Sequence, residues 1–249
     1  MVQLTIIKIT GYGPWTLTLG SDREHKLQML QASLYKEIQK LFSQKECLVF
    51  LNRFDEFFAV TNGLSLQDHV AIQQKLAQSF EIQLSMAIGH DNSPFEANLR
   101  AHEGRKSKIV LDSDHRIFGF VDGKKDHPVK ILHMDVDGLT SVSKIKSPYE
   151  VSSMMFTLYS KMLEFFLKKK SLTFFIGGDN FMIISSENGK ENAEQFIDLI
   201  KKEHGIVLNC GIGTAKTARD AVKLATQSLD KIRELRKTGK KQQILELSC

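Results

Sequence analysis

The chain has few of the residues that crosslink secreted proteins or bind zinc. It contains only three cysteines, Cys47, Cys210 and Cys249, which are far apart and form no CxxC pair. The sequence therefore indicates neither a disulfide framework nor a thiolate zinc site, and it favours a reducing, cytoplasmic setting. The eight histidines are scattered, without an HxH motif or a Cys/His cluster, which also argues against zinc.

Long apolar segments are absent as well. No uninterrupted run reaches the roughly 18 apolar residues that could span a bilayer, and no basic-then-apolar signal segment opens the chain. We therefore expect a soluble protein without a membrane partner. With 42% hydrophobic and 25% charged residues, the 249 residues can bury a substantial core in one large or two small domains.

The charge balance is basic. The formal net charge of +5 suits a polyanionic partner, which could be nucleic acid, a membrane surface or a nucleotide triphosphate. Much of the positive charge lies in residues 168–170 and 231–241. The simpler alternative for residues 168–170 is a solvated helix end, where lysine interacts favourably with the helix dipole.

A similar pattern of apolar runs and turns occurs twice along the chain. The strand-like runs of the first half are residues 4–9, 48–60 and 82–89, and those of the second half are residues 129–138, 172–184 and 206–213. When the halves are aligned, Lys8 meets Asp135 and Asp55 meets Asp179. The sequence therefore predicts a tandem duplication in which only the second copy keeps potential metal-binding carboxylates.

Apolar periodicity predicts the same order of elements in each half: strand, helix, strand, turn, strand, helix, strand. The amphipathic helices are expected at residues 23–42, 65–80, 147–170 and 191–204, and one more helix follows each half at residues 93–103 and 217–237. This order is typical of the split βαβ unit. We expect an α+β fold of two tandem ferredoxin-like or palm domains, residues 1–125 and 126–249, related by internal duplication.

Two turns of the second half carry the chemistry. Asp135 and Asp137 end an apolar strand, and Asp179 follows Gly177 and Gly178 between two apolar strands. If those strands pair, the carboxylates lie at one edge of the sheet, and Mg²⁺ prefers such hard oxygen ligands together with phosphate oxygens. Each motif alone has an ordinary alternative as a tight turn. Their joint occurrence at corresponding points of a duplicated unit favours a metal site.

The DVDG and GGDN turns, with the GIG that follows, resemble the palm domains of diguanylate cyclases and class III nucleotide cyclases. That resemblance implies a metal held by Asp135, the carbonyl of Val136 and Asp179. The sequence departs from the GGDEF signature at Asn180, where the cyclases have an acidic residue, and this weakens the case for cyclase chemistry.

A resemblance over nearly the whole chain is to the archaeal-type GTP cyclohydrolase III family. It is carried by an ordered set of motifs: TGYGPWT, DREHKLQMLQASLY, NRFD followed by AVTNG, and GGDN. The resemblance implies a magnesium-dependent, homo-oligomeric enzyme of flavin or deazaflavin precursor biosynthesis, with Asp135 and Asp179 as catalytic residues. Its substrate would be GTP rather than nucleic acid. The implied products are 2-amino-5-formylamino-6-(5-phosphoribosylamino)pyrimidin-4(3H)-one and two phosphates.

Substrate-binding residues can then be assigned as expectations. Arg233 and Lys237 stand four apart on one helix face, roughly where related cyclases bind phosphate, and an alignment shift of three would make Arg236 and Lys240 the pair. A solvated basic face is the alternative.

Base recognition is expected from the first half. Asn52 could hydrogen-bond guanine and Phe54 could stack on it, whereas the alternative is a surface hairpin with Arg53 paired to Asp55 and Phe54 in the core. His133 fits best as a satisfied interior histidine. Two other functions stay open: a nucleotide cyclase and a non-catalytic GTP-binding regulatory module.

Overall fold

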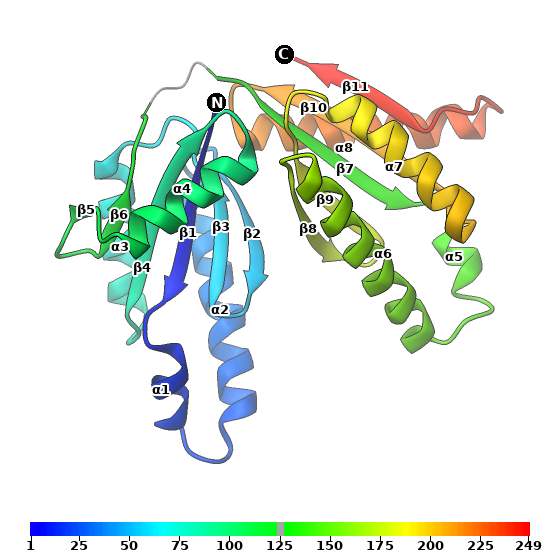
Figure 1. The fold of residues 1–249 in the computed structure, drawn as a ribbon. Coiled ribbons are helices and arrows are strands. Elements are labelled where there is room, and N and C mark those ends of the chain that lie inside the picture. Colours follow the sequence, from blue (N-terminus) through cyan, green and yellow to red (C-terminus); the bar gives the residue numbers. More distant parts are fainter. Residues whose placement is uncertain (124–126) are drawn as a thin grey trace. The chain divides into compact units, whose positions relative to one another are not determined.

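The computed structural model describes residues 1–123 and 127–249, which form two compact units. Unit 1 comprises Met1–Asn92 and Glu96–His127, and unit 2 comprises Ser93–Phe95 and Pro128–Cys249. The expected domain boundary between residues 125 and 126 falls outside the described residues, so its position stays a prediction. Figure 1 shows the course of the chain and the labels of its elements.

Unit 1 is built on a mixed sheet with the strand order β2-β3-β1-β4-β6-β5. Its strands are β1 (Val2–Ile9), β2 (Leu48–Arg53), β3 (Glu56–Val60), β4 (Leu84–Asp91), β5 (Val110–Asp112) and β6 (Ile117–Gly119). Its helices are α1 (Tyr12–Leu17), α2 (Arg23–Ser43), α3 (Leu66–Ser79) and α4 (Pro94–Lys106). Strand β1 pairs antiparallel with both β3 and β4, so the first four strands have the order of a ferredoxin-like unit.

Unit 2 repeats this topology, with the strand order β11-β10-β7-β9-β8. Its strands are β7 (Val129–Val136), β8 (Leu172–Gly177), β9 (Asn180–Ile184), β10 (Leu208–Ala215) and β11 (Ile244–Ser248). Its helices are α5 (Leu139–Val142), α6 (Pro148–Lys168), α7 (Gly189–His204) and α8 (Ala218–Lys237). The expected α+β fold of two ferredoxin-like or palm units is confirmed, and the added strand β11 pairs parallel with β10.

The strand register confirms the alignment of the two halves. Lys8 on β1 lies opposite Glu56 on β3, and at the matching place of unit 2 Asp135 lies opposite Asn180. Asp55 and Asp179 directly precede these partners. Lys8 therefore corresponds to Asp135, and Asp55 corresponds to Asp179.

Each core lies between one face of its sheet and two helices. In unit 1 the helices α2 and α3 bury Leu34, Ile38 and Leu76 against the sheet, and in unit 2 the helices α6 and α7 bury Phe166 and Phe196. Helices α4 and α8 lie on the other face of each sheet (Figure 1). Local sequence fixes two of the helix starts, because Ser65 and Ser147 each form a capping box with the acidic residue three positions later.

Glycine allows the outer helix to approach the sheet closely in both units. A Cβ atom on Gly89 would lie 2.3 Å from the carbonyl oxygen of Ala97, and one on Gly213 would lie 2.0 Å from that of Ala221. Such distances are far inside van der Waals contact, so only glycine fits at these strand positions. In both units the backbone of the outer helix therefore packs directly against a glycine of the sheet.

Candidate functional site

Strand β7 brings Asp135 to the face of the sheet that α8 covers. The alternation of a strand puts Leu132, Met134 and Val136 into the core with α6 and α7, so His133 and Asp135 point the other way. Asp135 is only 4% exposed. A carboxylate buried to this degree needs partners, and unit 2 supplies them from β10 and α8.

The β8–β9 hairpin places Asp179 beside Asp135. Asp135 and Asn180 are direct partners in the antiparallel ladder, where opposite Cα atoms lie about 4.5 to 5.5 Å apart. The turn before Asp179 needs glycine, because Gly177 and Gly178 have φ values of 114° and 62°. Tertiary pairing therefore brings the two turns identified in the sequence to one edge of the sheet.

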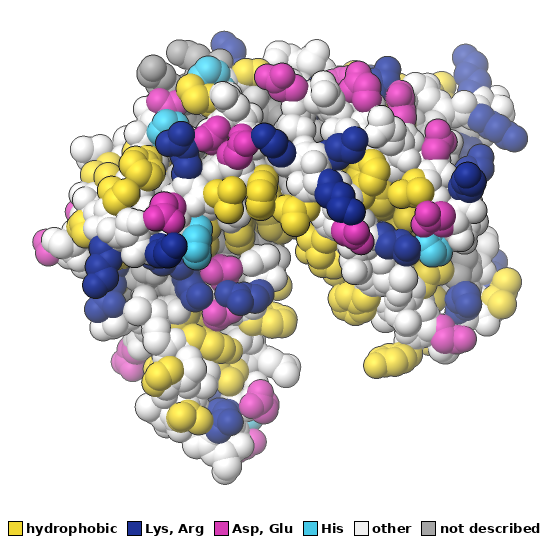
Figure 2. Space-filling model, in the orientation of Figure 1, with side chains coloured by type: hydrophobic (Ala, Val, Ile, Leu, Met, Phe, Trp, Pro, Cys, Tyr) yellow, Lys and Arg dark blue, Asp and Glu magenta, His cyan; other side chains and the backbone are white. Residues whose placement is uncertain are grey.

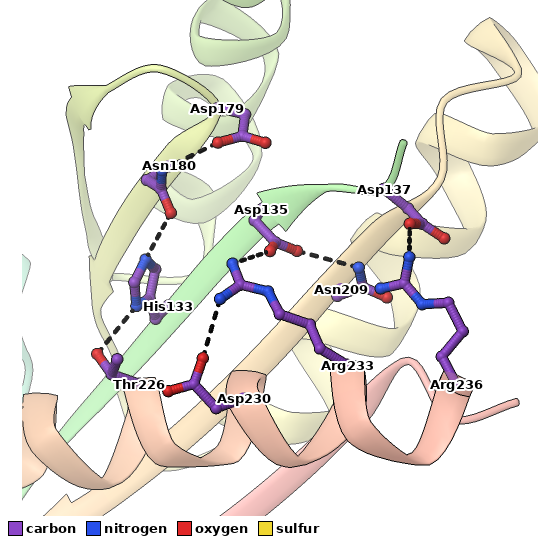
Figure 3. A network of polar contacts seen from close by, with 10 residues as sticks. All are labelled: His133, Asp135, Asp137, Asp179, Asn180, Asn209, Thr226, Asp230, Arg233 and Arg236. Carbon is purple, nitrogen blue, oxygen red and sulfur yellow. Dashed lines mark hydrogen bonds and ion pairs between the residues drawn. The ribbon is translucent and has the colours of Figure 1, made fainter. Parts of the chain in front are cut away.

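Both oxygens of Asp135 are hydrogen-bonded. Asn209 Nδ2 donates to Oδ1 at 3.0 Å, and a terminal nitrogen of Arg233 donates to Oδ2 at 2.7 Å (Figure 3). The other terminal nitrogen of Arg233 lies 2.9 Å from Asp230 Oδ1. The hydrogen bond to Asp135 is the largest influence on the pKa of Arg233, which is raised. This arginine is held as a fixed cation at the strand end.

A second arginine reaches the other strand-end carboxylate. Arg236 forms an ion pair with Asp137 (Figure 3), while Lys237 is the exposed last residue of α8. Lys240 follows the helix and is also exposed. The cations at these two carboxylates are therefore Arg233 and Arg236, one from each of the two expected pairs. Their binding of phosphate stays a prediction.

A hydrogen-bond chain connects α8 to Asp179. His133 Nδ1 lies 3.2 Å from Thr226 Oγ1, His133 Nε2 lies 3.0 Å from Asn180 Oδ1, and Asn180 Nδ2 donates to Asp179 Oδ1 at 2.9 Å (Figure 3). Because the amide oxygen of Asn180 only accepts, His133 Nε2 carries a proton. Burial is the main influence on the pKa of His133 and lowers it. The expected satisfied histidine is confirmed, and it orients Asn180.

Three further residues belong to this network, although no motif marks them: Asn209, Thr226 and Asp230. Only Asn209 leaves a signal in the sequence, since an amide inside the apolar run of β10 needs a buried partner. Thr226 and Asp230 sit on an amphipathic helix, where polar residues are ordinary.

The expected base-reading residues lie in unit 1, on the β2–β3 hairpin. Asn52 Nδ2 donates to Glu56 Oε1 at 2.9 Å, and Phe54 is 58% exposed. Arg53 and Asp55 form an ion pair at 3.5 Å, as in the surface-hairpin alternative, but Phe54 is not in the core as that alternative supposed. Recognition of guanine by these residues stays a prediction.

The donor set of unit 2 suits magnesium. Asp135 and Asp179 offer hard carboxylate oxygens, and the backbone carbonyl of Val136 lies between Asp135 and Asp137 in the chain. Within the described residues, no three His, Cys, Asp or Glu side chains gather as a group that could hold a metal. Magnesium needs no such cage, because it usually binds one or two carboxylates together with substrate phosphates. The residues present therefore fit Mg²⁺ with a nucleotide completing its coordination.

The fold and this site define a duplicated ferredoxin-like α+β protein with palm-type carboxylates in its second unit. The model of the GTP cyclohydrolase III family matches residues 1–245. The chain is 36% identical to the GTP cyclohydrolase III of Methanothermobacter thermautotrophicus, covering 94% of this chain and 95% of that protein. It is 37% identical to that of Methanocaldococcus jannaschii, covering 94% and 88%. The chain belongs to the GTP cyclohydrolase III family.

Solved structures of cyclases are similar to one part or to most of the chain. The active GGEEF domain of a diguanylate cyclase from Vibrio cholerae is 17% identical, with a TM-score of 0.37 over 43% of this chain and 78% of that one. A bacterial light-regulated adenylyl cyclase is 11% identical, with a TM-score of 0.40 over 94% of this chain and 83% of that one.

Among the described helices, none has the length and apolarity that a membrane crossing requires.

Proposed function

We propose that this protein is a GTP cyclohydrolase that opens the imidazole ring of GTP. One observation carries the proposal. The chain matches the family over residues 1–245, and within that range Asp135, Asp179 and two arginines lie at one edge of the unit 2 sheet. The proposed products are 2-amino-5-formylamino-6-(5-phosphoribosylamino)pyrimidin-4(3H)-one and two phosphates. Such a product feeds flavin or deazaflavin precursors, and we expect a cytoplasmic homo-oligomer.

The overall reaction requires hydrolysis at two places. One water adds at C8 and the C8–N9 bond breaks, so that C8 stays on N7 as the formyl group. Further waters cleave the phosphoanhydride bonds and release two phosphates. Asp135, Asp179 and the carbonyl of Val136 would hold Mg²⁺, which when bound supplies Lewis-acid activation of water and neutralises developing negative charge.

The remaining side chains of the site bind and orient. Arg233 and Arg236 offer guanidinium donors that match phosphate oxygens in pairs, so both suit the triphosphate. His133 and Asn180 hold the carboxylate of Asp179 in one orientation. In unit 1, Asn52 has the donor and acceptor groups to read guanine, and the exposed ring of Phe54 offers a stacking surface.

Product analysis tests this proposal directly. The full-length protein is incubated with GTP and MgCl₂, and the products are identified by mass spectrometry, with the Asp135→Asn variant as a control. We expect the formylated, ring-opened monophosphate and inorganic phosphate. A cyclic nucleotide with pyrophosphate would establish cyclase activity instead, and unchanged GTP would leave only the regulatory-module alternative.

The metal requirement needs a separate experiment. A strong chelator should remove activity, and magnesium or manganese should restore it, because the donors are carboxylate and carbonyl oxygens. Calorimetric titration of the nucleotide-free protein with MgCl₂, compared with the Asp135→Asn variant, gives a second readout that does not depend on turnover. Activity that depended on stoichiometric zinc would contradict the assignment.

A further inference from the structure

Unit 1 has a surface pocket at the place where unit 2 has its carboxylate site. The pocket has a volume of about 300 Å³ and lies between the outer face of the sheet and α4. Its charged and polar lining includes Lys8 and Glu56 from the strands and His102, Arg105 and Lys106 from the helix. Figure 2 shows basic side chains gathered beside a histidine and acidic side chains on this face of unit 1.

Register makes the correspondence specific at the sheet. Lys8 occupies the position of Asp135, and Glu56 occupies the position of Asn180. The matched glycine contacts extend the alignment to the helices, because Ala97 and Ala101 touch Gly89 as Ala221 and Ala225 touch Gly213. In the same register, the next residues of α4 correspond to those of α8: His102 to Thr226, Arg105 to Leu229 and Lys106 to Asp230.

The charge of this surface is reversed between the units. Unit 2 places Asp135 and Asp230 where unit 1 places Lys8 and Lys106, and it has Leu229 where unit 1 has Arg105. Helix α4 also ends at Lys106, whereas α8 continues for seven more residues, through both arginines that cover the unit 2 carboxylates. The corresponding space in unit 1 is therefore a pocket with cationic walls.

Glu56 is the one carboxylate in the pocket lining, and other groups already hold it. Its Oε1 accepts from Asn52 at 2.9 Å and lies 3.3 Å from the guanidinium of Arg53, and its Oε2 lies 3.7 Å from Lys8 Nζ. Lys106 Nζ also lies 3.9 Å from Glu103 Oε2, so the three lining cations, Lys8, Arg105 and Lys106, exceed the two carboxylates paired with them by one. The pocket is thus positive even before any contribution from His102.

Arg105, a residue of the pocket lining, carries an unsatisfied donor. Its Nε is buried, with no hydrogen-bond partner among the described residues. A buried donor without an acceptor costs free energy, which an incoming oxyanion would recover. Burial is also the main influence on the pKa of Arg105 and lowers it, although the guanidinium remains charged.

We propose that this pocket of unit 1 is an anion site for a phosphate group, held by Lys8, Arg105 and Lys106. The volume is at the lower end of the range of about 300 to 1,000 Å³ for small-molecule sites, which suits phosphate or a small phosphorylated molecule. The site is built from residues of unit 1 alone, so binding of a phosphate there can be measured without the proposed ring-opening activity.

Calorimetry on the full-length protein in magnesium-free buffer tests the proposal. The probes are inorganic phosphate and ribose 5-phosphate, which distinguish a free phosphate from a phosphorylated small molecule. We expect saturable binding of at least one probe, weakened about tenfold or more by Arg105→Leu, since a charge-assisted hydrogen bond is lost. Leucine is the residue that unit 2 carries at the matching position, so this change should leave the fold intact.

Two further variants make the result specific. Lys8→Gln should also weaken binding about tenfold, and it replaces Arg105→Leu if that variant does not fold. Lys223→Gln, which removes an exposed cation of α8, should leave the affinity unchanged. No saturable binding of either probe, or equal losses in Lys223→Gln and Arg105→Leu, would overturn the proposal.

Histidine-selective NMR locates the bound anion. His102 lines the pocket, and His133 lies on the carboxylate face of unit 2. Addition of the bound probe should shift the ring signals of His102 and leave those of His133 in place. A shift confined to His133 would place the anion at the unit 2 site and refute the assignment.

Discussion

The two units share a backbone and differ in what they carry on one face of it. Both have the ferredoxin-like strand order, and in both a strand glycine lets the outer helix approach closely. On that same face, unit 2 has Asp135 bonded to Arg233, and unit 1 has Lys8 paired with Glu56. The comparison shows that the two units share the packing of the scaffold, whereas the polar side chains at the strand ends differ in charge.

The hydrogen bonds from His133 through Asn180 to Asp179 have no counterpart at the matching positions of unit 1. His133 corresponds to Ile6 in unit 1, and Asn180 corresponds to Glu56. Asp55 is therefore paired with Arg53 at the hairpin instead of being oriented by an amide. The aspartate at the turn thus has different neighbours in the two units, and this is why we propose a metal site for unit 2 alone.

The largest expected effect is a loss of activity when the aspartates of unit 2, but not the matching aspartate of unit 1, are replaced. Asp135→Asn and Asp179→Asn should each lower the turnover of GTP by about a hundredfold or more, because each removes a carboxylate that would hold the metal. Asp55→Asn is the matched control in unit 1 and should stay within about threefold, since its surface ion pair contributes little. Steady-state kinetics in magnesium measures all three. Wild-type turnover by Asp179→Asn would contradict the assignment of the site.

A packing change should instead affect both units alike. Gly89→Ala and Gly213→Ala each force a methyl group into the backbone of the outer helix, so each should destabilise the protein by about 1 to 3 kcal/mol or more. Urea unfolding monitored by circular dichroism measures the loss. Gly13→Ala in α1 is the control, because nothing lies within 4 Å of its added Cβ. A large loss in only one unit would show that the helix contact is not equivalent.

The hairpin of unit 1 offers a smaller effect on specificity. Asn52→Ala should reduce the preference for GTP over ATP by about tenfold, since losing a hydrogen-bonding group from a base pocket costs about 1 to 3 kcal/mol. The ratio of kcat/KM for the two nucleotides measures it. Arg53→Ala, on the same turn, is the control for general disturbance of the hairpin. An unchanged ratio in Asn52→Ala would mean that guanine is read elsewhere.

The smallest expected effect concerns a core histidine found in unit 1 alone. His69 is fully buried, with its ring bonded to Thr5 and Ser65, whereas the matching helix position of unit 2 has the buried Ala193. Burial is the main influence on the pKa of His69 and lowers it from 6.5. The unfolded chain therefore binds more protons, so this contribution to stability is complete above pH 6.5 and falls as the pH drops below it.

The difference in unfolding free energy between wild type and His69→Gln isolates this effect. The advantage of the wild type should shrink between pH 7.5 and pH 5, because only the wild type carries the buried histidine at position 69. Parallel stability curves over this range would contradict the assignment of a buried neutral His69.

Sequence periodicity predicted the main helices to within a few residues. The expected helix at residues 65–80 is α3 with Ser65 as its N-cap and Phe80 as its C-cap, and the one at residues 217–237 is α8 with Thr217 as its N-cap. These predictions succeed because amphipathic spacing and capping are local. Short elements were harder to predict: β5, β11, α1 and α5 have too few residues for a periodic pattern to develop.

The sequence by itself determined the duplication, the α+β fold and the two carboxylate turns, since each of these follows from spacing along the chain. Only the tertiary structure decided which cations meet those carboxylates. Arg233 and Arg236 lie on a helix almost a hundred residues away from β7, and the choice between the two expected pairs depended on how far α8 extends over the sheet. The cationic pocket of unit 1 likewise arises from where α4 ends. Contacts between distant segments depend on packing geometry, which local propensity does not encode.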